Sequence, residues 1–469
     1  MNSELLRIFN ENDIIVSEDI ELNDIDPFYL LNFLKENNIS FVDGEVLERI
    51  KLELYNKNQN EFEVNSPQLS TFSGSAEEWS ALLSDRYDRI RRILSNNYKI
   101  PVSAIGNLRE IGNVNVIGII GEIKEKDNSF LFELEDPTGS IYCITTEEFL
   151  IRDAVVLVKG KFTGKFIIAD EIVYPNSFKS ERSKSNFDGY GAFISDIHVG
   201  SKLFAREEFS RFIKWINGEI EEYKDIASKI RYLFILGDAV DGVGVYPDQQ
   251  EEIETTDVKS EYLMLANYLS KIRKDIKIFM IPGNHDSSHN ALPQPPVSKE
   301  FAAPLYQIPN LILLYNPSFL TLKQPSIKVT LYHGNSIHYY VDNYQKFARM
   351  TREDIASILK ILLMTRHLAP SFGSAQVLPS KKDYLIIDEV PDILGIGDTH
   401  KAFITTYKNT IILNSGCWQY KTKYMAKFNI EPDLGKVPIV NLSDFDYTML
   451  DFSNERIKIF EEGINIKVK

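Results

Sequence analysis

Residues Tyr190–Ser201 read YGAFISDIHVGS, an apolar strand that stops abruptly at Asp196 and His198. Side chains two positions apart point to the same face of a strand or of its immediate extension, so both donors can converge on one ion. A carboxylate and an imidazole at the end of a strand make a metal site plausible. Polar residues are also ordinary after strands, so this triplet alone is a weak signal.

The same arrangement, an apolar run that ends at possible metal ligands, recurs four more times in order along the chain. Four of the seven histidines fall in these turns. Asp, Asn and His offer oxygen and imidazole donors suited to Mn, Fe, Zn or Mg. The further instances are Tyr232–Leu236 before Gly237-Asp238, Ile276–Ile281 before Pro282-Gly283-Asn284-His285-Asp286, Lys328–Tyr332 before His333-Gly334, and Ile393–Ile396 before Gly397-Asp398-Thr399-His400.

Strands alternate with helical patterns from residue 190 to residue 469. The helical patterns cover residues 206–223, 256–272 and 342–366. This alternation predicts a layered α/β domain over residues 190–469, with ligand residues at the carboxyl ends of its strands.

The donors in these turns suit a pair of divalent ions. Two ions about 3.5 to 4 Å apart can clamp a phosphate ester and activate a water between them. One carboxylate has to bridge the ions, and Asp238 is placed for this role. His285 is left to hold the phosphate or to protonate the leaving oxygen, with Asp286 orienting it, and Asp241 is a turn residue or a supporting carboxylate. The other donors form a first set of Asp196, His198 and His400 and a second set of Asn284, His333 and Asp398.

Three histidines lie outside this pattern. His289 and His338 lie near the motifs but fit no ligand spacing, so we interpret them as surface or channel-lining residues. His367 is interpreted as structural.

The upstream part of the chain divides into three segments. Residues 1–55 have helical spacing and predict a small helical docking domain. Residues 56–75 lose this periodicity and gain Asn, Ser, Gln and Pro, which predicts a flexible linker. Residues 76–180 begin with a helical pattern and continue with about five short strands separated by Gly turns, a pattern typical of a small closed barrel of the oligonucleotide-binding (OB) kind.

Two features of residues 76–180 leave their binding partner open. One face of the helix is basic, which indicates either a solvated surface or a nucleic-acid contact. Aromatic residues of the barrel could stack on bases, but such barrels also serve as protein-docking platforms. The basic residues are Arg86, Arg89, Arg91 and Arg92, and the aromatic residues are Phe130, Phe132, Tyr142 and Phe166.

Composition is that of a soluble globular protein. Of the 469 residues, 43% are hydrophobic and 25% charged, and no apolar run approaches the length of a membrane span. Acidic residues interrupt the first twenty residues, which therefore do not resemble a secretory signal. The two cysteines, Cys143 and Cys417, fit a reducing compartment. We therefore expect a cytoplasmic location. The net charge of −15 suggests that a partner or bound cations supply positive charge if the chain acts on nucleic acid.

Taken in order, the motifs DIH, GD, GNHD, HG and GxxH resemble those of the calcineurin-like metallophosphoesterases. Three further stretches are similar to the small subunit of archaeal family D DNA polymerases: GDAVDGVGVYPDQ, LPQPP and NSGCWQ, which start at Gly237, Leu292 and Asn414. The barrel with EDPTG at Glu135–Gly139 fits the same family.

This resemblance implies a metal-dependent 3′-to-5′ proofreading exonuclease within a two-subunit replicative DNA polymerase. The barrel and phosphoesterase domain would dock the large catalytic subunit, the substrate would be a DNA primer 3′ end, and a sliding clamp or primase is a further possible partner. The cofactors would be two divalent ions, Mn or Mg first and Fe or Zn as alternatives.

One motif departs from the resemblance. The family pattern ends in GHxH, whereas this chain has Asp398 in place of the first His. An aspartate can ligate Mn or Mg but adds a negative charge to the second set. Two alternatives therefore stay open: a catalytically degenerate scaffold subunit of the same polymerase, or an independent metallophosphoesterase.

Overall fold

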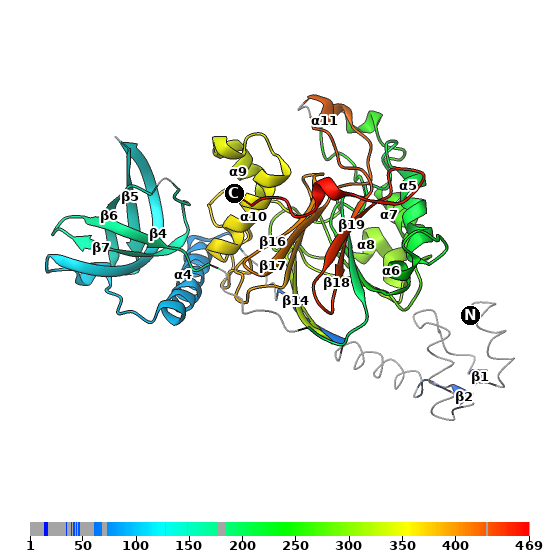
Figure 1. Ribbon diagram of the computed structural model, residues 1–469, viewed down its shortest axis with the longest axis horizontal. Coiled ribbons are helices and arrows are strands. Elements are labelled where there is room, and N and C mark those ends of the chain that lie inside the picture. The colour runs from blue at the N-terminus through cyan, green and yellow to red at the C-terminus, as the bar shows by residue number, and fades with distance from the viewer. Residues whose placement is uncertain are drawn as a thin grey trace.

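The computed structural model shows a closed β-barrel, a long helix and a domain of two packed sheets (Figure 1). The multidomain architecture with a barrel and mixed sheets is thus confirmed in this coarse form. The docking domain expected at residues 1–55 lies outside the described residues, apart from single positions that include a parallel pairing of β1 (Ile15–Val16) with β2 (Phe41–Val42). The structure describes residues 61–67, 73–126, 128–147, 149–176, 184–427 and 430–468, with nine single positions between 14 and 46.

Five strands close the barrel in the order β4-β5-β6-β8-β7, as the strand pattern predicts. Alternate side chains point inward, so Val116, Phe132 and Val158 are fully buried. Base stacking, one of the two roles left open for the barrel aromatics, does not apply to Phe132, because its ring fills the barrel core, whereas Tyr142 is 46% exposed. The strands are β4 (Gly112–Lys126), β5 (Ser129–Asp136), β6 (Gly139–Thr145), β7 (Val155–Phe162) and β8 (Ile167–Val173).

Two mixed sheets pack face to face in the second domain, with the orders β12-β11-β10-β9-β18-β19-β20 and β16-β17-β15-β14-β13-β3. The rings of Phe193, Phe234 and Phe279 stack between the sheets at centroid distances of 4.6 and 5.6 Å. Strands buried on both faces explain the continuous apolar runs before each motif. The strands are β3 (Phe62–Asn65), β9 (Tyr190–Ile194), β10 (Ile230–Leu236), β11 (Lys277–Ile281), β12 (Leu311–Leu313), β13 (Ser318–Lys323), β14 (Ser326–Leu331), β15 (Ile393–Ile396), β16 (Ala402–Tyr407), β17 (Thr410–Ser415), β18 (Lys436–Asn441), β19 (Tyr447–Asp451) and β20 (Lys458–Ile459).

Helices cover both outer faces of the sheet pair (Figure 1). The helices α5 to α8 lie over the seven-stranded sheet, and α9 and α10 lie over the six-stranded sheet on the side of the barrel. Along the part of the chain that the structure describes, no helix combines the length and the apolar character needed to cross a bilayer. The helices are α5 (Arg206–Ile216), α6 (Lys224–Ser228), α7 (Val258–Leu269), α8 (Lys299–Ala302), α9 (Ile337–Asn343), α10 (Arg352–Thr365) and α11 (Lys423–Lys427).

Helix α4 (Ala76–Tyr98) joins the barrel to the two-sheet domain. Arg86 Nε donates a 2.8 Å hydrogen bond to Asp383, and both side chains are buried. His367 Nε2 lies 2.9 Å from the same carboxylate, which supports its structural interpretation. Arg89 donates to the carbonyl of Asp383 at 2.7 Å. Neither alternative left open for the basic face, a solvated surface or a nucleic-acid contact, describes Arg86 and Arg89, because both side chains hold the helix against the two-sheet domain.

Part of the expected linker is a strand. Residues Phe62–Asn65 form β3, which pairs antiparallel with β13 at the edge of the six-stranded sheet. The Phe62 ring packs edge-on against Phe279 at a centroid distance of 5.0 Å. Phe62 and Val64 alternate with polar residues, so one face of this short strand is apolar although its surroundings have the composition of a linker. The prediction of a flexible linker over residues 56–75 is wrong for this segment.

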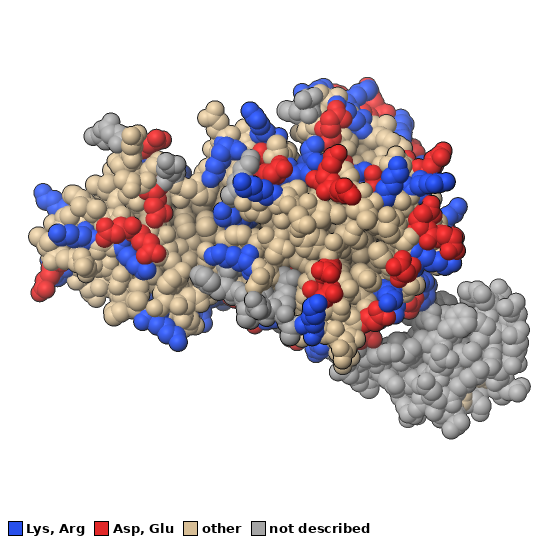
Figure 2. All heavy atoms as spheres, viewed as in Figure 1, with Lys and Arg blue, Asp and Glu red and all other residues tan. Residues whose placement is uncertain are grey.

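Charged side chains of both signs are spread over the molecule. Figure 2 shows Lys and Arg interspersed with Asp and Glu on the face in view. Although the net charge is −15, basic side chains are exposed on this face, where a polyanion could contact them.

Candidate metal centre

The metal-competent residues follow the carboxyl ends of strands from both sheets, namely the neighbours β9 and β10 of the seven-stranded sheet and β15 of the six-stranded sheet. Asp196 and His198 follow β9, Asp238 follows β10, and Asp398 and His400 follow β15. All five have positive φ angles, between 50° and 68°. A left-handed residue breaks the strand and turns its side chain back over the strand ends, at a cost of about 1 kcal/mol or more each. Such conformations cluster at functional sites, where the surrounding fold holds them in place.

Glycines let these turns approach each other closely. A Cβ at Gly283 would lie 2.2 Å from Asp238 Oδ1, and a Cβ at Gly397 would lie 2.8 Å from Asp196 Oδ2. Both contacts are shorter than side chains tolerate. The Gly in GNHD and the Gly in GDTH are thus required because carboxylates of the centre occupy the space of a side chain.

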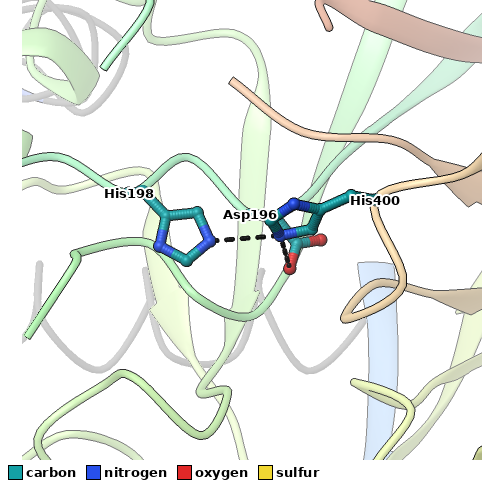
Figure 3. A group of neighbouring side chains, drawn as sticks. All are labelled: Asp196, His198 and His400. Atoms are coloured by element: carbon teal, nitrogen blue, oxygen red, sulfur yellow. Dashed lines mark hydrogen bonds and ion pairs between the residues drawn. The ribbon is translucent and has the colours of Figure 1, made fainter. Parts of the chain in front are cut away.

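The first predicted set converges on one point (Figure 3). Nε2 of His198 lies 3.3 Å from Nε2 of His400, which lies 3.4 Å from Asp196 Oδ1. Two ligand atoms that each lie about 2.1 Å from an ion, at tetrahedral or octahedral angles, are separated by about 3.0–3.4 Å. The observed separations therefore fit donors that share one ion.

The second predicted set meets beside the first. His333 Nε2 lies 2.9 Å from Asn284 Oδ1, 3.4 Å from Asp238 Oδ1 and 3.8 Å from Asp398 Oδ1. Asp196, Asp238 and His333 also present ligand atoms within 4.8 Å of one another. Asp238 therefore lies between the two sets, in the position that a shared carboxylate requires.

Hydrogen bonds around the centre fix the direction of the imidazoles. His333 donates from Nδ1 to the carbonyl of Leu236 at 2.8 Å, which leaves Nε2 facing the centre. Nδ1 of His198 lies 3.1 Å from Asp241 Oδ1. Partners of this kind set the tautomer and ring orientation of metal-binding histidines. Asp241 is fully buried, as expected of a supporting carboxylate, and it accepts hydrogen bonds from the side-chain amides of Gln249 and Gln419.

His285 lies at the side of the first set. Its ring packs edge-on against His198 at a centroid distance of 4.7 Å, and its backbone N–H donates to Asp238 Oδ1 at 2.8 Å. Its Nδ1 donates to the carbonyl of Asp241 at 2.7 Å, so Nε2 is the nitrogen left for chemistry. The prediction that Asp286 orients this ring is wrong. Asp286 instead accepts from the backbone N–H of Gly283 at 2.9 Å and holds the turn.

Burial and neighbouring charge shift the acids of the centre in opposite directions. Burial raises the pKa of Asp238, but the imidazoles of His333 and His285 outweigh it and hold that pKa below its ordinary value. Burial, together with the Asp238 charge, raises the pKa of Asp286 to about 6. Asp238 is therefore an anion suited to bind cations, while Asp286 serves the turn rather than the centre.

The structure brings His338, interpreted from the sequence as a surface or channel-lining residue, to the edge of the centre with its side chain half exposed. Its Nε2 lies 3.2 Å from Asp398 Oδ2. The signal in the sequence is the start of α9 four residues after His333, which returns the first helical turn to the strand ends. The sequence gives no signal for two further partners of Asp241, because Gln249 lies in a short 3₁₀ turn and Gln419 is 178 residues away.

These donors could hold divalent metal ions. Carboxylate, amide and imidazole ligands suit Mn, Mg, Fe and Zn, and Asp398 Oδ2 is buried without a well-formed hydrogen bond in the described part of the chain. The structure brings together the residues that the sequence predicts as metal ligands, and their role as ligands stays a prediction: Asp196, His198, Asp238, Asn284, His333, Asp398 and His400.

Comparison with known proteins identifies the family. Residues 192–405 match the family model that describes the B subunits of DNA polymerases alpha and epsilon. The DNA polymerase II small subunit of Methanothermobacter thermautotrophicus is 36% identical over 400 residues, covering 81% of both chains. That of Thermoplasma acidophilum is 31% identical over 469 residues, covering 95% of this chain and 93% of the relative.

Solved structures show a weaker likeness. Zinc-complexed Vps29 from Entamoeba histolytica is 12% identical with a TM-score of 0.31, covering 58% of this chain and 96% of that one. A novel archaeal phosphodiesterase is 11% identical with a TM-score of 0.26, covering 58% and 99%. On the strength of the sequence relatives, the chain belongs to the family of archaeal DNA polymerase II small subunits.

Proposed function

We propose that this chain is a metal-dependent 3′-to-5′ exonuclease that proofreads for a separate large polymerase subunit. The observation that supports this most is the meeting of two donor sets at the strand ends, with Asp238 between them. Two ions held in this way suit hydrolysis of a phosphodiester. The family supplies the polymerase context, since its named members are polymerase small subunits.

The residues divide the work as follows. Asp196, His198 and His400 would hold one ion, and Asn284, His333 and Asp398 the other, with Asp238 shared. Divalent ions in such a pair polarise the phosphate and lower the pKa of a bound water.

The chain's own side chains then act on the DNA end. Asp241 and the Leu236 carbonyl keep the imidazoles aimed at the centre. His285 Nε2 gives a proton to the 3′ oxygen of the penultimate nucleotide as the bond from that oxygen to phosphorus breaks. The water oxygen forms the new bond to phosphorus, so the products are a nucleoside 5′-monophosphate and a shortened 3′-hydroxyl end.

The barrel and the two-sheet domain provide the surface for the large subunit. Exposed apolar side chains on the barrel, including Ile111, Tyr142 and Ile168, support a protein-docking role for this domain. A clamp or primase contact and the docking role of residues 1–55 belong to the same proposal. The expected cytoplasmic location follows from a role on chromosomal DNA.

Asp398 favours one competing function, a scaffold subunit without catalysis. A carboxylate in place of the expected imidazole adds charge to the second set. The two functions differ in whether the chain, with its large subunit, removes nucleotides.

The test is degradation of a primer with a mismatched 3′ nucleotide in Mn²⁺, using the chain alone and with the large subunit. A 5′ label gives a ladder of shortened primers if nucleotides leave from the 3′ end. We expect Asp238→Ala to abolish the ladder, and Asp225→Ala, at an exposed aspartate on α6, to leave it unchanged. If the wild-type complex is inert, the exonuclease proposal is wrong and the scaffold function replaces it.

A further inference from the structure

The second donor set contains Asp398, a carboxylate that lies between His333 and His338. The Asp398 side chain is 12% exposed, and its two oxygens face different groups. Oδ1 lies 3.8 Å from His333 Nε2, on the side of the other donors. Oδ2 lies 3.2 Å from His338 Nε2. The carboxylate therefore spans the gap between the donor set and helix α9.

His338 is held at this place by the fold. It lies in the first turn of α9, directly after the turn that carries His333. The preceding Ser336 donates from its backbone N–H to the Tyr332 hydroxyl at 2.8 Å and from Oγ to the Leu368 carbonyl at 2.6 Å. The His338 ring is half exposed, so it lies at the open side of the centre. Packed turns and buried hydrogen bonds, rather than a loose loop, set its position.

The carboxylate of Asp398 lacks a hydrogen-bond donor of good geometry, and His338 lies close enough to supply one. The backbone N–H of Asp398 donates to both Asp196 oxygens at 3.1 Å, and these bonds fix the turn without involving the Asp398 carboxylate. Its Oδ2 is buried and lacks a hydrogen bond of good geometry among the described residues. At 3.2 Å, a small rotation of the His338 ring completes an N–H to oxygen bond.

We propose that Asp398 and His338 act as one unit at the second metal site. Asp398 binds the ion through Oδ1, and His338 donates from Nε2 to Oδ2. The donated bond holds the carboxylate in one rotamer and offsets the charge that Asp398 brings. Partners of metal ligands typically contribute 10-fold to 100-fold in metal affinity. His338 is thus a positioning residue, and the inference rests on the two-ion centre of the proposed function.

Mn²⁺ titration of the full chain, followed by electron paramagnetic resonance, tests this without reference to activity. Wild type binds two ions. Asp398→Ala binds one, and His338→Ala binds two with the weaker site loosened about 10-fold to 100-fold. His338→Gln, whose amide can still donate to Oδ2, recovers most of the affinity. The matched control is His289→Ala, which removes an exposed imidazole elsewhere and leaves both sites unchanged.

Each other outcome overturns a distinct statement. Unchanged affinity in His338→Ala shows that His338 does not position Asp398. Loss of a whole ion in His338→Ala, as in Asp398→Ala, shows that His338 is itself a ligand. Equal weakening in His338→Gln and His338→Ala excludes the donated bond. If wild type binds fewer than two ions, the two-ion centre of the proposed function fails first.

Discussion

Replacement of His285 by alanine separates proton donation from metal binding. The backbone N–H of residue 285 donates to Asp238, and alanine keeps this bond. The substitution removes the ring, whose Nδ1 is held by the Asp241 carbonyl and whose Nε2 is left for the leaving oxygen. We therefore expect loss of hydrolysis with both ions still bound and with large-subunit assembly intact.

The size of the rate loss in His285→Ala follows from the role of His285 as a general acid. Loss of a positioned general acid lowers the rate by about 10²-fold to 10⁴-fold. This range corresponds to about 2.7 to 5.4 kcal/mol in the activation free energy. The loss should depend on the leaving group, because a nitrophenolate departs without a proton and a deoxyribose 3′ oxygen does not.

The assay compares two phosphodiesters with the same enzyme preparations. Removal of a mismatched 3′ nucleotide should fall by the full factor in His285→Ala, while cleavage of a nitrophenyl phosphodiester should fall far less. Mn²⁺ titration confirms that both ions remain. An equal loss on both substrates would refute proton donation by His285, and unchanged exonuclease activity would remove it from the reaction.

Three further predictions concern the support of the centre and the fold. Asp241→Ala removes the carboxylate beside His198 Nδ1, so the Mn²⁺ affinity of the site formed by Asp196, His198 and His400 should fall about 10-fold to 100-fold in a titration. An unchanged affinity would show that Asp241 does not position His198. Arg86→Ala leaves the buried Asp383 carboxylate without its cation, so the free energy of unfolding in urea should fall by about 3–5 kcal/mol. The control is Arg91→Ala, on the exposed face of the same helix, which should be nearly neutral. Equal effects of the two substitutions would contradict a stabilising buried pair. Burial raises the pKa of Glu261 from 4.5 to about 8, so the folded state holds a proton that the unfolded state releases, and stability should fall as pH rises from about 4.5 to about 8. Glu261→Gln should flatten that part of the pH–stability curve, and an unchanged slope would show that Glu261 does not cause it.

The strand ends of the centre could be predicted from sequence because two local signals coincide there. Apolar runs buried on both faces have the length of strands, and each stops at a Gly or at a residue that tolerates a left-handed conformation. Parallel pairing of β9 with β10 places Asp196 and Asp238 at one edge of their sheet, and the packing of the six-stranded sheet against it brings Asp398, which follows β15, to the same place.

The partners of these residues could not be predicted in the same way. His338 and Gln419 reach the centre through the packing of whole elements, which leaves no local pattern. Asp286 follows His285 directly, yet the turn points its carboxylate toward backbone N–H groups and not toward the ring. Adjacency in sequence did not determine contact at this turn.

Local composition gave the wrong indication for two segments, the one that contains β3 and the basic face of α4. The segment with β3 is polar overall, but the sheet edge needs only Phe62 and Val64 on one face to bind it. The basic face of α4 left a solvated surface and a nucleic-acid contact open, but Arg86 pairs with the buried Asp383 and Arg89 with the exposed Asp388 of the two-sheet domain. In both cases a long-range partner decided the outcome.

The most direct test of the two-ion centre is anomalous diffraction from crystals of the chain grown with Mn²⁺. The account predicts two peaks about 3.5 to 4 Å apart, with Asp238 between them. One peak should lie against Asp196, His198 and His400, and the other against Asn284, His333 and Asp398. A single peak, or none at the strand ends, would contradict it.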